Sequence, residues 1–207
     1  MFIKFYENHI LPTAIEYACG NESITNERMR LIPLAEGQVL EIGMGSGLNL
    51  PYYIPGKIRQ FWGLEPSQAM LKKAAARISL VQFDIRLLDL PGEAIPLDDE
   101  SVDMVVMTYA LCTIPDGQAA LQQIRRVLKT GGKLLFAEHG LAPDSNTAKW
   151  QNRINPFWKR VGGGCNLNRP IDKMIIEAGF EIIQLEKYYL DSVPRIAGFH
   201  YRGIAVK

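Results

Sequence analysis

Residues 39–49 of this 207-residue chain read VLEIGMGSGLN, and this stretch decides the fold. An apolar run of strand character ends in glycines at every second position: Gly43, Gly45 and Gly47. Glycine lets a backbone approach a ligand in conformations that a Cβ atom would forbid. Because open α/β sheets bind ligands at the carboxyl ends of their strands, we expect this loop to contact a ligand. A tight structural turn is the alternative interpretation.

Apolar runs of strand length alternate with helix-length periodic segments on both sides of this loop. Strands are predicted at 38–42, 61–64, 85–88, 102–108 and 133–137, and helices at 67–78 and 116–128. The runs are short and continuous, which is typical of strands buried on both faces of a parallel sheet. The order therefore predicts an α/β fold with a doubly wound, mostly parallel sheet. Two final strands, at 180–189 and 199–206, leave no room for a helix between them and should pair antiparallel.

The flanking segments differ from this pattern. Residues 1–30 are predicted to be helical and amphipathic, whereas residues 141–170 contain no clear strand. A helix from about Ser145 to Arg160 is expected to break or bend near Pro156. A further helix at 171–178 should stop at Gly179. The length fits a single domain, 1–207, with these segments as additions to its core.

Composition excludes several classes of function. Lys and Arg total 23 and Asp and Glu total 22, a net charge of +1 that argues against a nucleic-acid binder. No apolar run approaches the 18 residues of a transmembrane segment, and the N-terminal stretch lacks the features of a signal peptide. Three widely spaced cysteines form neither a disulfide framework nor a metal knuckle. We therefore expect a cytoplasmic protein without a bound metal.

Two glutamates sharpen the prediction. Glu65 ends the second strand, 18 residues after Gly47, where a carboxylate accepts both hydroxyls of an adenosine ribose in dinucleotide folds. Glu41 lies inside an apolar strand and should face a polar site, because burying an unpaired carboxylate is costly. Dinucleotide folds use GxGxxG, but Leu48 follows Gly47 here. A nicotinamide-dependent oxidoreductase is therefore the less favoured alternative of the same fold.

These residues resemble class I S-adenosylmethionine-dependent methyltransferases, as do GEAIPLDDESVD at 92–103 and RVLKTGG at 126–132. The resemblance implies a seven-stranded, Rossmann-like methyltransferase fold with an antiparallel last strand, and S-adenosyl-L-methionine as cofactor. It implies that the glycine loop passes under the methionine part and that Glu41 orients this loop. The remaining implied cofactor contacts are Glu65 with the ribose, Pro66, Gly92 and Glu93 with the adenine, and Met107 and Thr108 with the methyl region. Pro91 stands where many relatives have Asp.

Shorter motifs, LCTIPD at 111–116, EHG at 138–140 and GCNLNR at 164–169, resemble a bacterial branch close to the animal thiol methyltransferases. This implies a small, fairly apolar acceptor with a thiol, hydroxyl or amine. Residues 1–30 would cover the cofactor and residues 141–170 would cap the substrate. The alternatives are a phospholipid N-methyltransferase with peripheral membrane contact and a non-catalytic regulatory module that binds S-adenosylmethionine.

The predicted catalytic residues are His139 and Tyr6. His139 follows the fifth strand and has a pKa suited to deprotonating an acceptor, although a structural hydrogen bond is the alternative. Tyr6 lies on the predicted N-terminal helix and either contacts the methionine carboxylate or the acceptor, or packs the helix. Cys112 is expected to be a small buried hydrophobe. The loop from Cys165 to Arg169 is either a cover over the site or a surface turn, and the aromatic residues Trp150, Phe157 and Trp158 form either a cap or core.

Overall fold

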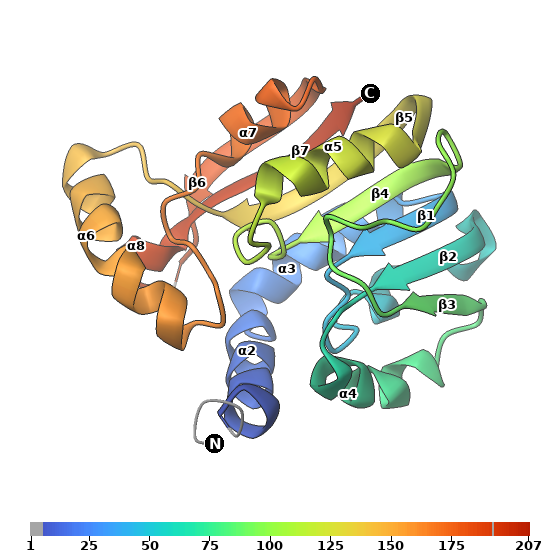
Figure 1. The fold of residues 1–207 in the computed structure, drawn as a ribbon, viewed down its shortest axis with the longest axis horizontal. Helices are drawn as coiled ribbons and strands as arrows, with labels where there is room; N and C mark the ends of the chain where they lie inside the picture. Colours follow the sequence, from blue (N-terminus) through green and yellow to red (C-terminus); the bar gives the residue numbers. More distant parts are fainter. Residues whose placement is uncertain (1–5, 192) are drawn as a thin grey trace.

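The computed structural model describes residues 6–191 and 193–207, which form one seven-stranded sheet (Figure 1). The strand order is β3-β2-β1-β4-β5-β7-β6. Strand order reverses between β1 and β4, and the carboxyl ends of these strands flank the crevice where such folds bind ligands. The strands are β1 (Gly37–Ile42), β2 (Ile58–Leu64), β3 (Ile85–Leu88), β4 (Val102–Thr108), β5 (Leu128–His139), β6 (Glu181–Tyr189) and β7 (Phe199–Val206).

The predicted sheet direction is confirmed. β1 pairs in parallel with β2 and β4, and β4 pairs in parallel with β5. The last strand, β7, inserts antiparallel between β5 and β6, and Phe136 lies opposite Gly203 in the ladder. The α8 turn (Arg195–Gly198) precedes β7, so the connection holds one short helical turn that was not expected.

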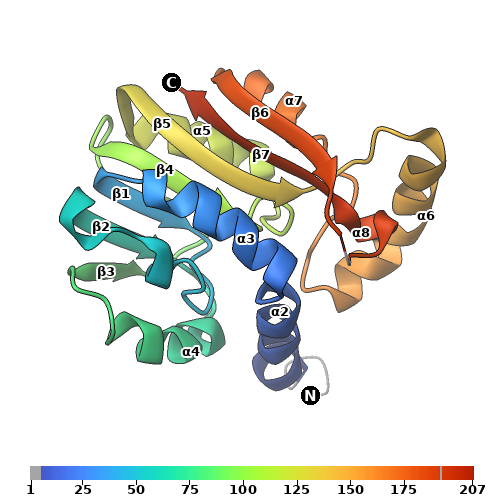
Figure 2. The same cartoon turned by 180° about the vertical axis from the view of Figure 1, so that it is seen from behind.

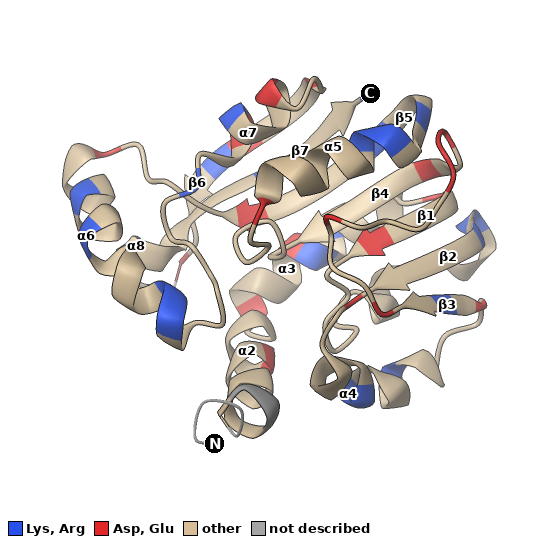
Figure 3. Cartoon of the chain, viewed as in Figure 1, with Lys and Arg blue, Asp and Glu red and all other residues tan. Residues whose placement is uncertain are grey.

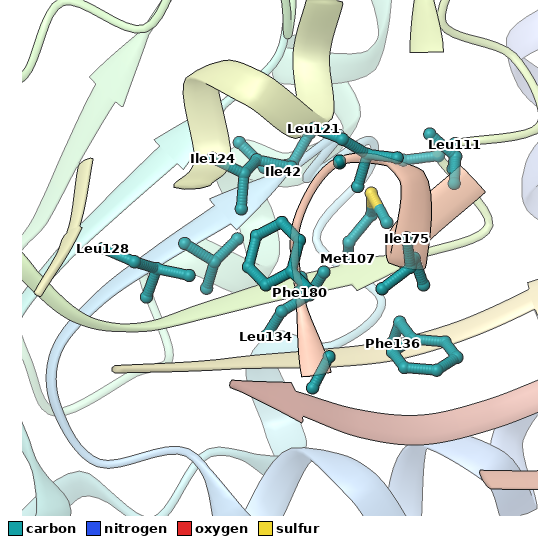
Figure 4. Close-up of a cluster of buried hydrophobic side chains, with 14 of the residues drawn as sticks. Ile42, Met107, Leu111, Leu121, Ile124, Leu128, Leu134, Phe136, Ile175 and Phe180 are labelled. Atoms are coloured by element: carbon teal, nitrogen blue, oxygen red, sulfur yellow. The ribbon is translucent and has the colours of Figure 1, made fainter. Parts of the chain in front are cut away.

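Two helical layers cover the sheet. Helices α3 (Glu22–Leu31) and α4 (Gln68–Ile78) pack on one face, and α5 (Gly117–Val127) and α7 (Ile171–Glu177) pack on the other, as Figures 1 and 2 show. Side-chain caps explain where the helices begin: Ser67 caps α4 and Asp116 caps α5. The core on the α5 side contains Met107, Leu121, Phe136 and their neighbours (Figure 4).

Two helical segments lie beyond the carboxyl ends of the strands. The N-terminal segment comprises the π-helix η1 (Tyr6–Ile10) and α2 (Leu11–Cys19), and the second is α6 (Ser145–Val161). Of the predicted break or bend near Pro156, the break is wrong, because α6 runs through this residue. The 3-10 turns η2 (Ile32–Leu34), η3 (Leu50–Tyr52) and η4 (Pro55–Lys57) complete the fold. None of the helices in the described part of the chain is long and apolar enough to cross a membrane.

Candidate functional site

A cavity of about 340 Å³ opens at the carboxyl ends of β1, β2 and β4, within the size range of small-molecule sites. Helix α2 and the loop of residues 91–93 complete its wall. The predicted contact residues in this wall are Glu41, Gly43, Gly45, Glu65, Pro66, Gly92, Glu93 and Thr108. Four other predicted residues, Tyr6, Gly47, Met107 and His139, do not line it.

The glycine loop needs its glycines for shape. Gly43 has φ +67°, and a Cβ atom there would lie 2.6 Å from the Ala110 methyl carbon. Gly45 has φ +58° and presents its backbone to the cavity. Gly47 instead packs the loop against Leu50, since its Cβ would lie 2.9 Å from a Leu50 methyl group. Residues with a side chain at these positions would strain the loop or collide with its neighbours, so the glycines keep the space beside the loop open.

Met107 is fully buried in the core, a correction to the predicted contact with the methyl region. Successive side chains of a strand point to opposite faces, so the residues of β4 contribute to both cores. Only Thr108, at the end of the strand, reaches the cavity and bonds Asn49 there. The apolar β4 run did not reveal which of these two neighbours would face the cavity.

Two carboxylates are positioned toward the cavity by backbone N–H groups. Glu65 accepts hydrogen bonds from the N–H of Gly45 at 2.9 Å and of Ser67 at 2.8 Å, one on each oxygen. Burial raises the pKa of Glu65, although these donors favour its charged form. Glu93 accepts from the Asp116 N–H through Oε1, whereas its buried Oε2 has no partner among the described residues. Each carboxylate retains free lone pairs for a ligand's hydroxyl or amine.

A buried polar chain fixes the loop after β1. Asn49 donates to Glu41 Oε1 at 2.9 Å, and the Tyr53 hydroxyl donates to Glu41 Oε2 at 2.7 Å. Burial raises the pKa of Glu41 to about 7, against the lowering effect of the bonds from Tyr53 and Asn49. Glu41 therefore faces a polar network, as its place in an apolar strand predicted.

Arg28 is a site residue that sequence reasoning missed. It lies on α3, is only 4% exposed and is the only Lys or Arg in the wall within the described part of the chain. Its guanidinium donates to Asn49 Oδ1 at 2.9 Å and to the Cys19 carbonyl at 2.6 Å, and lies 5.5 Å from the centre of the Tyr109 ring. These contacts include no carboxylate, so the positive charge is available to an anionic ligand.

Glu138 shapes the part of the cavity wall beside Gly43 and was also missed. Its fully buried carboxylate accepts from three successive N–H groups, those of Ala110, Leu111 and Cys112, at 2.7, 2.9 and 3.3 Å. Burial raises the pKa of Glu138 to about 7 even so. Tyr109, just before this turn, has φ +54°, and its buried hydroxyl has no partner in the described chain. Such strain in a non-glycine residue occurs at ligand sites held by their surroundings.

The two predicted catalytic residues lie beside the cavity. The Tyr6 hydroxyl donates to the Val161 carbonyl at the end of α6, a helix-packing contact. His139 Nε2 lies 3.2 Å from Cys165 Sγ. Burial acts to lower the pKa of His139, but the hydrogen bond with Cys165 and the charge interactions with Cys165 and Glu138 together outweigh it, and the net shift is upward. The bond with Cys112 and burial raise the pKa of Cys165.

The aromatic residues of α6 fit neither interpretation. Trp150, Phe157 and Trp158 are 56%, 66% and 37% exposed, so they are not core, and they do not line the cavity. The loop that follows α6 does reach the cavity through Gly163. Cys112 is buried, as expected, but it also meets Cys165, which its sequence position did not reveal.

Comparison with known proteins identifies the class of fold. The family model described as a methyltransferase domain matches residues 40–136. An S-adenosylmethionine-dependent methyltransferase of Thermotoga maritima shares the fold with a TM-score of 0.66 at 21% identity, over 100% of this chain and 98% of that chain. The chain therefore has the fold of a methyltransferase.

Relatives place the chain more narrowly. The thiol S-methyltransferase TMT1B of Homo sapiens is 37% identical over 180 residues, which cover 84% of this chain and 72% of that protein. The phosphatidylethanolamine N-methyltransferase of Cereibacter sphaeroides is 30% identical over 157 residues, 72% of each chain. The chain belongs to the S-adenosylmethionine-dependent methyltransferases, in the family that includes the thiol S-methyltransferases.

Proposed function

We propose that this enzyme methylates the sulfur atom of a small, apolar thiol. The observation that carries the proposal is the composition of the cavity wall. It combines the two carboxylates and the arginine described above with an apolar side formed by Leu11, Pro12 and Ile15 of α2. Such a side selects an uncharged, hydrophobic acceptor. The similarity to proteins named thiol S-methyltransferases supports sulfur as the attacked atom.

The residues of the wall fit S-adenosylmethionine. Glu65 would accept the ribose hydroxyls and the unpartnered Glu93 Oε2 would accept the adenine amine. Arg28 would pair with the methionine carboxylate, and the glycine loop gives the backbone room beside it. When bound, the cofactor supplies an electrophilic methyl group on a sulfonium, which passes to the acceptor sulfur as the old carbon–sulfur bond breaks.

The protein's own contribution is positioning and exclusion of water. A thiol as acidic as that of cysteine, with a pKa of about 8.5, is a few per cent ionised at pH 7, so its proton can leave to solvent. Helix α2 closes the cavity on one side, and the Glu138-bound turn fixes Ala110 against the glycine loop. Holding the two reactants in line accounts for a large share of such an acceleration. His139 and Tyr6 stay predicted catalytic residues without a place in this wall.

A matched acceptor series tests the attacked atom. Hexanethiol, hexanol and hexylamine share one chain and differ in the reacting atom, and formation of S-adenosylhomocysteine reports turnover. We expect product with the thiol alone. Turnover of the amine or the alcohol without the thiol would refute sulfur attack. Cofactor binding with no product from any acceptor would instead support the non-catalytic module.

A second candidate is methylation of a phospholipid amine at a membrane surface. Helix α6 exposes Trp150 and Phe157, and its charged residues are all basic, as the blue segments of Figure 3 show. Aromatic and basic residues on one helix suit an anionic lipid surface. Vesicles of phosphatidylethanolamine and phosphatidylglycerol test it: co-sedimentation together with methylated lipid would favour this candidate, and a protein that stays in the supernatant would exclude it.

A further inference from the structure

Three side chains from distant segments meet beside the cavity: Cys112 after β4, His139 at the end of β5 and Cys165 after α6. Their donor atoms all lie within 4.8 Å of one another. The described chain provides no second hydrogen-bond partner for the His139 ring, which also lies 6.3 Å from the His200 ring: Nε2 faces Cys165 Sγ at 3.2 Å and the buried Nδ1 has no hydrogen bond. The sulfur atoms make only weak, long hydrogen bonds, such as that of Cys112 Sγ to the Tyr109 carbonyl at 3.6 Å, and within the described residues these leave the buried His139 Nδ1 unsatisfied.

We propose that Cys112, His139 and Cys165 bind a thiophilic divalent cation, of which zinc is the type. Zinc–sulfur and zinc–nitrogen bonds of about 2.3 and 2.0 Å put tetrahedral ligand atoms about 3.5–3.8 Å apart. In this cluster the His139 Nε2 and Cys165 Sγ atoms are 3.2 Å apart, and no two donor atoms are more than 4.8 Å apart. Side-chain movements of about 1 Å or less would therefore bring the three donor atoms to the spacing of zinc ligands. Two thiolates and one imidazole form a set that soft and borderline cations prefer.

The surrounding contacts hold the three ligands in place. Asn166 ties the two cysteine loops together, since both its backbone and side-chain N–H groups donate to the Cys112 carbonyl, at 2.8 and 2.9 Å. Glu138 holds the Cys112 N–H at 3.3 Å, and Trp158 Nε1 donates to Cys165 Sγ at 3.4 Å. Hydrogen bonds of this outer kind orient ligands and stabilise thiolate sulfur.

The cluster borders the cavity, so a molecule in the cavity could supply the fourth ligand of the cation. Thr113, next to Cys112, and Gly163, two residues before Cys165, both line the cavity. Three protein ligands leave one position open, the arrangement of catalytic zinc sites. A thiol acceptor would occupy it as a thiolate after releasing its proton to solvent, and a ligating His139 could then not serve as a base. This part rests on the proposed function, whereas the cation site itself does not.

Metal binding is measured on the reduced, chelator-treated full chain by zinc titration against a competing chelator and by absorption after addition of Co²⁺. We expect one equivalent of zinc and a thiolate-to-cobalt charge-transfer band. Cys165→Ser should weaken zinc by more than about 100-fold, beyond the loss that follows removal of an outer-shell partner. The matched Cys19→Ser variant removes the third free cysteine and should keep both signals. Absent binding, or equal binding by Cys165→Ser, would overturn the proposal, as would a Cys112–Cys165 disulfide that persists in the presence of zinc.

The acceptor role has its own readout. Hexanethiol should alter the cobalt spectrum, and hexanol should leave it unchanged. A thiol that is methylated without altering the spectrum would overturn the acceptor role. A protein that binds zinc but methylates no thiol would refute the proposed function and leave the cation site standing.

Discussion

Replacing Arg28 by methionine removes the only Lys or Arg from the cavity wall of the described chain while keeping a long side chain. A hydrogen bond to a charged group contributes about 1.5–3 kcal/mol, so a lost carboxylate contact should weaken S-adenosylhomocysteine binding about tenfold to 150-fold. Methylthioadenosine lacks the amino-acid part and should bind the variant and the parent alike. Calorimetry with both ligands isolates the contact with the carboxylate.

Controls separate this contact from general damage. Arg28 also satisfies Asn49 Oδ1 and the Cys19 carbonyl, and each acceptor left unpaired costs about 1–3 kcal/mol of stability. Thermal unfolding must therefore accompany the calorimetry. Arg59→Met removes an exposed arginine paired with Asp103 and should change neither affinity. If Arg28→Met weakens both ligands equally, or neither, Arg28 does not bind the carboxylate.

Three further outcomes are expected. Because the pKa of Glu41 is raised to about 7 in the folded state, its contribution to stability is present below pH 4.5 and is lost as the pH rises through about 7. The melting temperature of the ligand-free protein should fall between pH 5 and pH 8, and a Glu41→Gln variant with the same slope would contradict this. Gly43→Ala, at positive φ against a neighbouring methyl group, should lower the free energy of unfolding by about 2–5 kcal/mol, measured by urea unfolding, whereas Gly56→Ala, with open space around it, should be neutral. Tyr6→Phe should cost about 1 kcal/mol or less and leave turnover unchanged, since among the described residues the hydroxyl bonds the Val161 carbonyl alone, and a tenfold loss of turnover would support its predicted catalytic role.

The fold was predictable because its signals are local. The apolar run ending at Gly43, the capping residues Ser67 and Asp116, and the short connection before β7 each specify an element through its own residues. Errors occurred where tertiary packing decides. A proline lowers helix propensity, yet α6 continues through Pro156 because the helix is set by its surroundings as well as its sequence.

Some residues of the site could be predicted from local sequence signals, and others could not. Glu65 and Glu93 are tied to strand ends and loops that the sequence marks, so their approach to one cavity could be predicted. The place of Arg28 in the cavity wall could not be predicted, because α3 is a largely polar helix. Which of its sides is buried follows only from the packing of α3 on the sheet (Figure 2). Cys112 and His139 could have been associated from the sequence, because Cys112 comes shortly after β4 and His139 ends β5, and the carboxyl ends of these neighbouring parallel strands lie side by side. Cys165, more than fifty residues after Cys112, had none.

Glu138 connects the two halves of this site. Its carboxylate holds three successive N–H groups of residues 110–112, and so fixes Ala110 against the glycine loop and Cys112 within the cation cluster. A buried carboxylate costs several kcal/mol unless its oxygens are bonded, so the three bonds must form together with the fold. The wall facing the cofactor and one ligand of the cluster are then positioned by one side chain. Movement of this turn would disturb both at once, which explains why a costly buried carboxylate stands at the end of an otherwise apolar strand.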